Sequence, residues 1–393
     1  MTRAVLKIEQ LEQLLHHLAT GQITTFDGHD SSLSELCQPL LQEAAIHLQE
    51  SWAAHMTPAL APYSLLASQI ATLHSGNLLS AELYPLLHQA QESTSHWLCQ
   101  RFQQNHALFT HGGSYANLEA LWRARDASRS PSTIVYGSHA THYSVGKACQ
   151  LLGLNFQAIE TDNQDRMDID SLRKACHQQE PVAIVFNAGS SALGSLDSID
   201  DIVSIAKEMK CWLHIDAAWG GALMLLPEHQ DRFASLLQQA DSITFDPHKA
   251  LFQPKPCSVL LSKTAASCYS DVGYLTSSPQ KRLSGSYGGE LFLPLWLNLQ
   301  MLGENWFFQQ IRLRLSHASQ FARQLSALTD WPVVCSETGI VTFETPQPGQ
   351  LQPLVEQGLF STARLQHRVV YRAVFASTQT KPDTLIRSLH PFL

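Results

Sequence analysis

The 393-residue sequence predicts an α/β fold: a large domain with a mostly parallel sheet covered by helices, and a small C-terminal α+β domain. From residue 132 onward, short apolar runs alternate with amphipathic stretches, which is typical of β-α-β units. The chain is also too long for one simple core. We place an N-terminal helical arm at residues 1–60, the large domain at 61–305, and a linking helix with the small domain at 306–393.

The segment before the alternation has helical periodicity. Apolar residues recur at helical spacing over residues 4–19 and again from Ser31 to Gln49, which predicts two amphipathic helices. These helices pack either on a partner subunit or on their own chain. A proline-bearing loop around Thr57 follows, and then two further helices, at about 63–75 and 84–103.

The remaining elements follow in chain order. In the large domain we expect strands at 133–136, 157–160, 183–187, 211–215, 242–245 and within 254–263, and helices at 115–125, 142–152, 170–178, 200–208 and 291–302. Residues 268–290 are rich in Ser and Gly and predict a loop. The last part predicts helices at 306–328, 352–359 and 382–389 and strands at about 332–336, 340–344 and 368–375.

Composition excludes several classes of function. A net charge of −8 and the lack of any Lys/Arg run argue against nucleic-acid binding. The 19 histidines and 8 cysteines are scattered without metal-ligand spacing, so we expect no metal. Scattered cysteines, no apolar leader segment and no stretch of about 18 apolar residues predict a soluble, cytoplasmic protein that does not bind membranes.

The chain's most informative stretch is residues 211–256. One expected strand is followed by Asp216 and the next by Lys249. Because ligands bind beyond the carboxyl ends of parallel strands, both side chains are expected in one crevice. Pyridoxal phosphate needs such a pair: the lysine forms a Schiff base with its aldehyde, and the acid keeps its pyridine nitrogen protonated. The alternative is a salt bridge at the end of a sheet.

Two further segments carry candidate ligand-binding residues. Gly113 and Ser114 belong to a Gly-Gly-Ser turn that opens a predicted helix, and free N–H groups at such a terminus can bind phosphate. The alternative is that the turn is only a helix cap. His142 precedes another predicted helix and, considered alone, would cap it.

The string HIDAAWGG followed by DSITFDPHK resembles the group II amino-acid decarboxylases, which have fold type I. Lys249 follows Asp216 by 33 residues, close to the interval in that family. GGSYAN and GSHATHYSVGKA resemble two further family segments, and the similarity spans about residues 54–389. The resemblance implies the aspartate-aminotransferase-like fold, pyridoxal 5'-phosphate as cofactor, and a homodimer with its active site at the interface.

The resemblance also implies roles for single residues. Lys249, Asp216, His142 and His248 are the expected catalytic residues. Arg372 either receives the substrate's α-carboxylate or braces the site, and Thr57 lies in a loop that contributes to the substrate pocket. The expected cofactor contacts are Lys249, Asp216, Ala218, His142 on the ring, Ser191, His248, and Gly113, Ser114, Tyr115 and Asn117 at the phosphate.

The activity implied is decarboxylation of an L-amino acid to its amine, and an acidic substrate is favoured over an aromatic one. Two alternatives remain open: another reaction on the same cofactor, either transamination or C–C cleavage, and a catalytically reduced binding protein. The second arises because Gly285-Ser286-Tyr287 lacks the arginine of the family's G-S-R segment. Tyr287 and Tyr274 are tyrosines near the place of the family's proton-donating lid residue, and neither matches that residue clearly.

Overall fold

The fold is seen in a computed structural model, which describes residues 22–24, 30–32, 40, 43–268, 275, 280–365 and 368–393. The predicted helix at 4–19 and Tyr274 lie outside these residues. The prediction of a helix from Ser31 is wrong at its start, because strand β2 (Asp30–Ser32) pairs antiparallel with β1 (Gln22–Thr24). Much of that predicted helix lies outside the described residues, and a 3-10 helix covers Ala45–Leu48.

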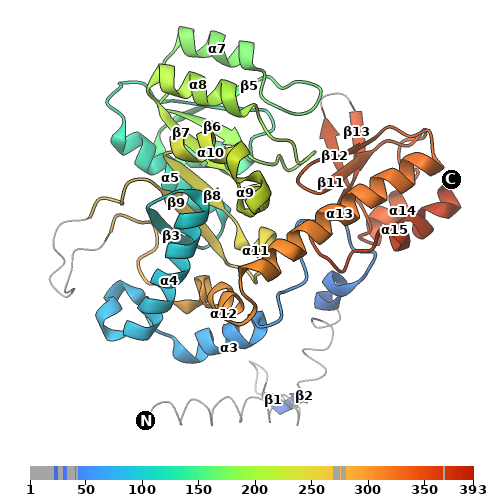
Figure 1. The fold of residues 1–393 in the computed structure, drawn as a ribbon, viewed down its shortest axis with the longest axis horizontal. Helices are drawn as coiled ribbons and strands as arrows, with labels where there is room; N and C mark the ends of the chain where they lie inside the picture. The colour runs from blue at the N-terminus through green and yellow to red at the C-terminus, as the bar shows by residue number, and fades with distance from the viewer. Residues whose placement is uncertain are drawn as a thin grey trace.

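A seven-stranded sheet forms the centre of the larger part of the chain (Figure 1). Strands β4 to β8 run parallel, whereas β9 pairs antiparallel with both β3 and β8. The predicted mostly parallel sheet is confirmed. In spatial order the strands are β3 (His106–Thr110), β9 (Ser258–Ser262), β8 (Ser242–Phe245), β7 (Trp212–Asp216), β6 (Ala183–Asn187), β4 (Ile134–Ser138) and β5 (Asn155–Ile159).

Two details of this sheet differ from the prediction. Strand β3 was missed, because its five residues carry only a short apolar run directly before the Gly-Gly-Ser turn. Strand β7 extends one residue further than predicted and ends on Asp216, whose backbone pairs with both Asn187 and Thr244. The acid is therefore held by two neighbouring strands rather than by a free loop.

Helices cover both faces of the sheet, as alternation along buried strands requires. In β6, Val185 faces a cluster with helices α5 (Gly113–Ala127) and α6 (Tyr143–Leu152), whereas Ile184 and Phe186 belong to the cluster on the opposite face. The helices on that opposite face include α4 (Pro85–Phe102), α7 (Ile169–Gln178), α8 (Ile199–Met209) and α10 (Gln230–Gln239). Helices α3 (Ser64–His74) and α12 (Leu293–Leu302) pack together beside α4 (Figure 1).

A second, antiparallel sheet forms the smaller C-terminal part. Helix α13 (Glu304–Leu328) runs diagonally from the large part to this sheet and packs on it (Figure 1). Strand β12 was not predicted, because its burial pattern alternates without a fully buried face. The domain boundaries themselves remain a prediction. The sheet order is β10 (Val333–Cys335), β11 (Ile340–Phe343), β13 (Arg368–Val374) and β12 (Ser361–Leu365), with helices α14 (Gln352–Glu356) and α15 (Pro382–Leu389) beside it.

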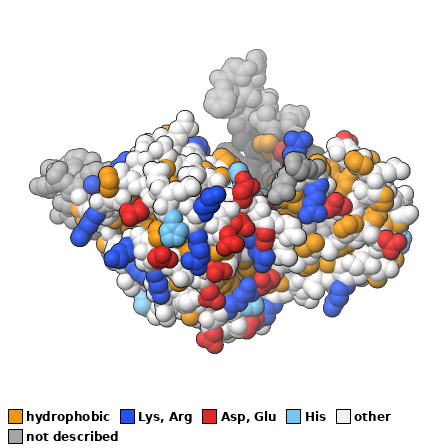
Figure 2. Space-filling view, turned by 90° about the horizontal axis from the view of Figure 1, so that it is seen from above, with side chains coloured by type: hydrophobic (Ala, Val, Ile, Leu, Met, Phe, Trp, Pro, Cys, Tyr) orange, Lys and Arg blue, Asp and Glu red, His pale blue; other side chains and the backbone are white. Residues whose placement is uncertain are grey.

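No helix in the described part of the chain is long and apolar enough to cross a membrane. On the face shown in Figure 2, acidic and basic side chains are interspersed rather than separated into patches of one sign. This mixture agrees with the moderate net charge of −8.

Arg314 is a buried cation that links the two parts of the chain. Its side chain is 1% exposed, lies 4.6 Å from the ring centroid of Trp219, and donates to the carbonyls of Thr338 (3.1 Å) and Phe375 (3.2 Å). Burial lowers the pKa of Arg314 to about 10.

We expect Arg314→Leu to lower the free energy of unfolding by about 3 kcal/mol, because it leaves two carbonyls without their donor. Arg312 on the same helix pairs with Glu228 at the surface, so Arg312→Leu is a matched control that should cost about 1 kcal/mol or less. Urea unfolding measures both free energies. Equal losses in the two variants would show that the buried hydrogen bonds of Arg314 do not stabilise the fold more than a surface ion pair does.

Candidate active site

A cavity of about 410 Å³ opens at the carboxyl edge of the parallel strands. Because β4, β6, β7 and β8 all end at this edge, the segments that follow them converge on it. The lining includes most of the residues singled out from the sequence, namely Gly113, Ser114, Tyr115, His142, Ser191, Asp216, Ala218, His248 and Lys249.

Asp216 is held at the end of β7 by donors on two sides. Its side chain is 9% exposed; Oδ2 accepts from Asn117 Nδ2 at 2.9 Å and Oδ1 accepts from the Ala218 backbone N–H at 3.2 Å. The sequence suggested Asn117 as a phosphate ligand. In the structure it lies on the second turn of α5, and its amide faces Asp216 instead. The contact of Ala218 with Asp216 is made by the backbone N–H, so it does not depend on the alanine side chain.

Lys249 lies in the short helix α11 (Pro247–Ala250), directly after β8. Its Nζ is 2.8 Å from Oδ2 of Asp246, which is 1% exposed and also accepts from Ser258 Oγ at 2.6 Å. Burial by itself would lower the pKa of Lys249, but the charge of Asp246 outweighs it and holds that pKa above its usual value. Asp246 was missed at the sequence level, although its place two residues before His248-Lys249 was a usable signal.

His248 is oriented by the strand next to it. Its Nδ1 is 2.8 Å from the carbonyl of Cys257, so Nδ1 carries a proton and Nε2 faces Asp246 Oδ2 at 3.6 Å. Burial lowers the pKa of His248, against the opposing charge of Asp246. The ring next to Lys249 is thus held in one orientation between the Cys257 carbonyl and Asp246.

His142 both caps a helix and lines the cavity, so its predicted role as a helix cap is compatible with its predicted place beside the cofactor. As the N-cap of α6, its Nδ1 accepts from the Ser144 N–H at 3.3 Å and lies 2.7 Å from Ser144 Oγ. Burial lowers the pKa of His142, against the charges of Asp216 and Asp246, and the ring lies beside the cavity.

The start of α5 supplies donors for an anion. Within the described part of the chain, the N–H groups of Gly113 and Ser114 have no protein acceptor, whereas that of Tyr115 is bonded to Gly112. Gly112 has a φ of +127°, a conformation that glycine adopts without strain. A helix N-terminus with free donors, a lysine and a buried acid in one cavity together fit the phosphate, aldehyde and ring nitrogen of pyridoxal phosphate.

Gly113 makes a testable contribution to this cradle. A Cβ added there would lie 2.9 Å from both carboxylate oxygens of Asp246. We expect Gly113→Ala to weaken pyridoxal phosphate binding at least about tenfold, because the methyl group displaces the turn or the acid. Gly146→Ala is the control, since its Cβ meets only ordinary contacts at 3.7 Å. Absorbance titration with the cofactor measures both, and unchanged affinity in Gly113→Ala would contradict the assignment.

Some predicted site residues lie outside the cavity. Arg372 does not line it; its Nε donates to the Ala192 carbonyl at 2.9 Å, next to Ser191, so its geometry is that of a brace. Thr57 is also outside the lining, although its neighbour Met56 is part of it. Tyr287 stacks under Arg282 at 3.7 Å, so an arginine is present near this segment, three residues before Gly285.

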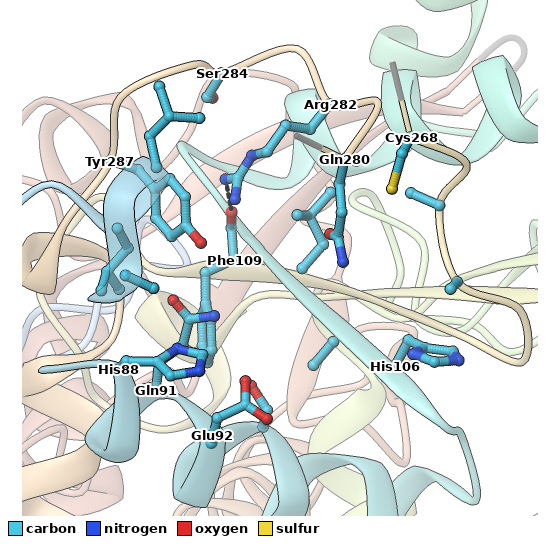
Figure 3. A pocket seen from close by; sticks show the side chains of 18 of the residues that line it. His88, Gln91, Glu92, His106, Phe109, Cys268, Gln280, Arg282, Ser284 and Tyr287 are labelled. Carbon is cyan, nitrogen blue, oxygen red and sulfur yellow. Dashed lines mark hydrogen bonds between the residues drawn. The ribbon is translucent and has the colours of Figure 1, made fainter. Parts of the chain in front are cut away.

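A second cavity, of about 730 Å³, lies between α4, β3 and the segment at 280–287 (Figure 3). Figure 3 shows His88 and Glu92 of α4 on one side and Arg282 and Tyr287 on the other. Although this cavity is larger, none of its described lining residues is a lysine. Its described lining therefore offers no amine for a Schiff base, whereas the smaller cavity offers Lys249 beside Asp216 and the start of α5.

The fold and the smaller cavity define a pyridoxal-phosphate enzyme of fold type I. Comparison with protein families makes the assignment narrower: residues 123–345 match the model described as the pyridoxal-dependent decarboxylase conserved domain. The chain belongs to this family, is a pyridoxal-phosphate-dependent amino-acid carboxy-lyase, and uses pyridoxal 5'-phosphate.

Similar curated proteins carry several substrate names. The chain is 29% identical over 343 residues to an aromatic-L-amino-acid decarboxylase of Bacillus atrophaeus, covering 76% of this chain and 71% of that protein. It is 32% identical to the L-2,4-diaminobutyrate decarboxylase of Rhizobium meliloti and 29% identical to acidic amino acid decarboxylase GADL1 of Mus musculus, covering 61% and 67% of this chain. The chain spans about half the length of each of the latter two, 51% in both cases.

Solved structures confirm the fold. Oryza sativa TDC with pyridoxal phosphate and tryptamine aligns with a TM-score of 0.82 at 17% identity, covering 92% of this chain and 87% of that one. Mouse CSAD aligns with a TM-score of 0.82 at 20% identity, covering 98% and 92%. These identities are too low to transfer a substrate.

Proposed function

We propose that this enzyme decarboxylates an L-amino acid with an acidic side chain, and that the cavity described above is its active site. In this proposal Lys249 binds the cofactor, Asp216 faces its ring nitrogen, and His142 lies against the ring. The donors at Gly113 and Ser114, with Tyr115 beside them, receive the phosphate, while Ser191 lies near the cofactor's edge and His248 orients the phosphate or moves protons. The proposal is supported by the convergence of these side chains on one cavity.

The bound cofactor supplies an electron sink for the pair of electrons left when CO₂ departs. The protein's own residues provide the rest. The charge of Asp216, fixed by Asn117 and the Ala218 N–H, favours a protonated ring nitrogen. Asp246 keeps the free Lys249 protonated and oriented until the cofactor arrives. Arg372 supports the Ser191 segment from behind rather than contacting substrate.

The charges in the cavity favour an acidic substrate. Asp216 and Asp246 are the carboxylates among the described lining residues, and both already have donors. Lys147 and Lys255 also line the cavity, and neither has a carboxylate within ion-pair distance in the described part of the chain. Because the α5 donors serve the phosphate, these two lysines provide positive charge for a substrate carboxylate.

The test is a comparison of kcat/KM for aspartate, glutamate, tyrosine, tryptophan and 2,4-diaminobutyrate, in wild type and in Lys147→Gln and Lys255→Gln. We expect an acidic amino acid to be the best substrate and at least one lysine variant to raise its KM about tenfold, with Lys174→Gln on the exposed face of α7 as control. If an aromatic substrate is best and neither variant changes KM, the acidic assignment is wrong.

The aromatic alternative has its own supporting observation. The rings of Tyr115 and Trp219 line the same cavity, and Trp219 is 2% exposed, so an apolar wall exists. Lys147 and Lys255 favour the acidic assignment over the aromatic one, because an apolar side chain offers them no carboxylate to pair with.

We further propose that the enzyme is a cytoplasmic homodimer with its active site at the interface. Tyr115 (44% exposed) lines the cavity, Tyr143 (71% exposed) contacts the ring of His142, and Leu151 on the same helix as Tyr143 is 67% exposed. The seven described cysteines are free thiols, in agreement with a reducing compartment. Sedimentation or light scattering of the holoenzyme tests the dimer.

A further inference from the structure

A continuous chain of hydrogen bonds lies behind Asp216, and its central member is Asn117. Asn117 is 1% exposed. Its side-chain amide donates from Nδ2 to Asp216 Oδ2 and to Ser144 Oγ, both at 2.9 Å. Its Oδ1 is 3.0 Å from Nε2 of His214, which is fully buried on β7. His214 Nδ1 lies 2.8 Å from Ser242 Oγ, which accepts from Trp212 Nε1, also at 2.8 Å.

The direction of every bond in this chain is fixed by chemistry. An ionised carboxylate only accepts, so Asn117 must turn its NH₂ toward Asp216 and its oxygen toward His214. That oxygen also only accepts, so His214 must carry its proton on Nε2. Nδ1 of His214 is then an acceptor for the Ser242 hydroxyl, whose oxygen is left to accept from Trp212.

A second branch reaches His142. Ser144 Oγ accepts from Asn117, so its own hydrogen is free to donate to His142 Nδ1 at 2.7 Å. Nδ1 therefore accepts, and the neutral ring of His142 carries its proton on Nε2. The two hydrogens of one buried amide thus serve Asp216 and, through Ser144, His142.

We propose that Asn117 is a positioning residue that holds the carboxylate of Asp216 in place as a hydrogen-bond acceptor and fixes the tautomer of His142, and that His214 sets the orientation of the Asn117 amide. This inference rests on the proposed function, in which Asp216 and His142 contact the cofactor. The pKa of His214 is lowered to about 4 by burial, which agrees with the neutral ring that the chain requires. The titratable groups that face Asp216 are Lys249, His142 and His214, and its hydrogen-bond donors are Asn117 Nδ2 and the Ala218 N–H.

A matched pair of substitutions at His214 separates positioning from packing. The amide nitrogen of a glutamine is as many bonds from Cα as Nε2 of histidine, so His214→Gln can still donate to Asn117. The amide of an asparagine corresponds to Nδ1, so His214→Asn keeps only the contact toward Ser242. Both replacements are buried neutral amides, and a purely structural role predicts similar effects of the two.

The readouts are the dissociation constant of pyridoxal phosphate, the visible spectrum of the bound cofactor, and kcat against KM. We expect His214→Gln to stay within about threefold of wild type in cofactor affinity, and His214→Asn to bind at least about tenfold more weakly, with an altered spectrum. If the two variants match each other in affinity and spectrum, the inference is overturned.

Asn117→Asp tests the same chain without changing His214. It keeps an oxygen toward His214 but places a carboxylate oxygen where Nδ2 donates to Asp216. We expect cofactor affinity to fall at least about tenfold, and wild-type affinity and spectrum would overturn the inference. If wild-type protein itself neither binds the cofactor nor releases CO₂, the proposed function fails and the inference with it; if wild type is active, matching His214 variants contradict the inference alone.

Discussion

We expect the Lys249→Ala variant to release CO₂ from the best substrate at least about 10³-fold more slowly than wild type. The loss follows from geometry: Lys249 extends from α11 into the cavity, 2.8 Å from Asp246, and it is the lining lysine that directly follows strand β8 at the carboxyl edge of the sheet. The visible band of the bound cofactor should disappear as well. Initial rates of CO₂ release and an absorbance spectrum measure both effects.

Lys249→Arg is the matched control for charge. It retains a cation beside Asp246 but cannot form a Schiff base, because guanidinium is not a nucleophilic amine at neutral pH. We expect its activity to be as low as that of Lys249→Ala, whereas its melting temperature should stay nearer to wild type. Substantial activity in either variant would mean that another lysine holds the cofactor.

The second large effect is expected for Asp216→Asn, which should lower kcat/KM about 10²- to 10³-fold. The replacement keeps the size of the side chain but removes the negative charge that faces the ring nitrogen. It also replaces one of two accepting oxygens by an NH₂ group, so either Asn117 Nδ2 or the Ala218 N–H loses its acceptor. Steady-state kinetics on the cofactor-saturated enzyme gives the value.

Asp216→Glu separates charge from position, since it keeps the carboxylate but moves it by one methylene in a site where Asp216 is 9% exposed. We expect an intermediate loss, smaller than that of Asp216→Asn. If Asp216→Asn keeps wild-type kcat/KM at saturating cofactor, the carboxylate does not act on the ring and the proposed geometry is incorrect.

Much of the fold followed from the sequence because its signals are local. The apolar runs before Asn187 and Asp216 predict buried strands, and strands alternating with amphipathic helices can close only into a mostly parallel sheet. Among the elements that were missed, the strands β3 and β12 are short and carry little contrast between apolar and polar positions. Their strand character comes from pairing with β9 and β13, which no local pattern encodes.

In the candidate site, too, the features that follow from neighbouring residues could be predicted, whereas contacts between residues far apart in the sequence could not. Asp216 and Lys249 could be placed from the sequence, because each directly follows a strand of one sheet. The contact of Asn117 with Asp216 joins residues 99 positions apart, so the sequence could only assign Asn117 to the neighbouring phosphate turn. Arg372 was placed by motif, but its role depends on the Ala192 carbonyl, 180 residues away.

The most direct test of the account is to locate the cofactor chemically. The holoenzyme would be reduced with borohydride, digested and mapped by mass spectrometry for a phosphopyridoxyl-lysine. Three lysines line the cavity, namely Lys147, Lys249 and Lys255. The account predicts the modification on Lys249 alone, whereas modification of Lys147 or Lys255, or of no lysine in a preparation saturated with cofactor, would contradict it.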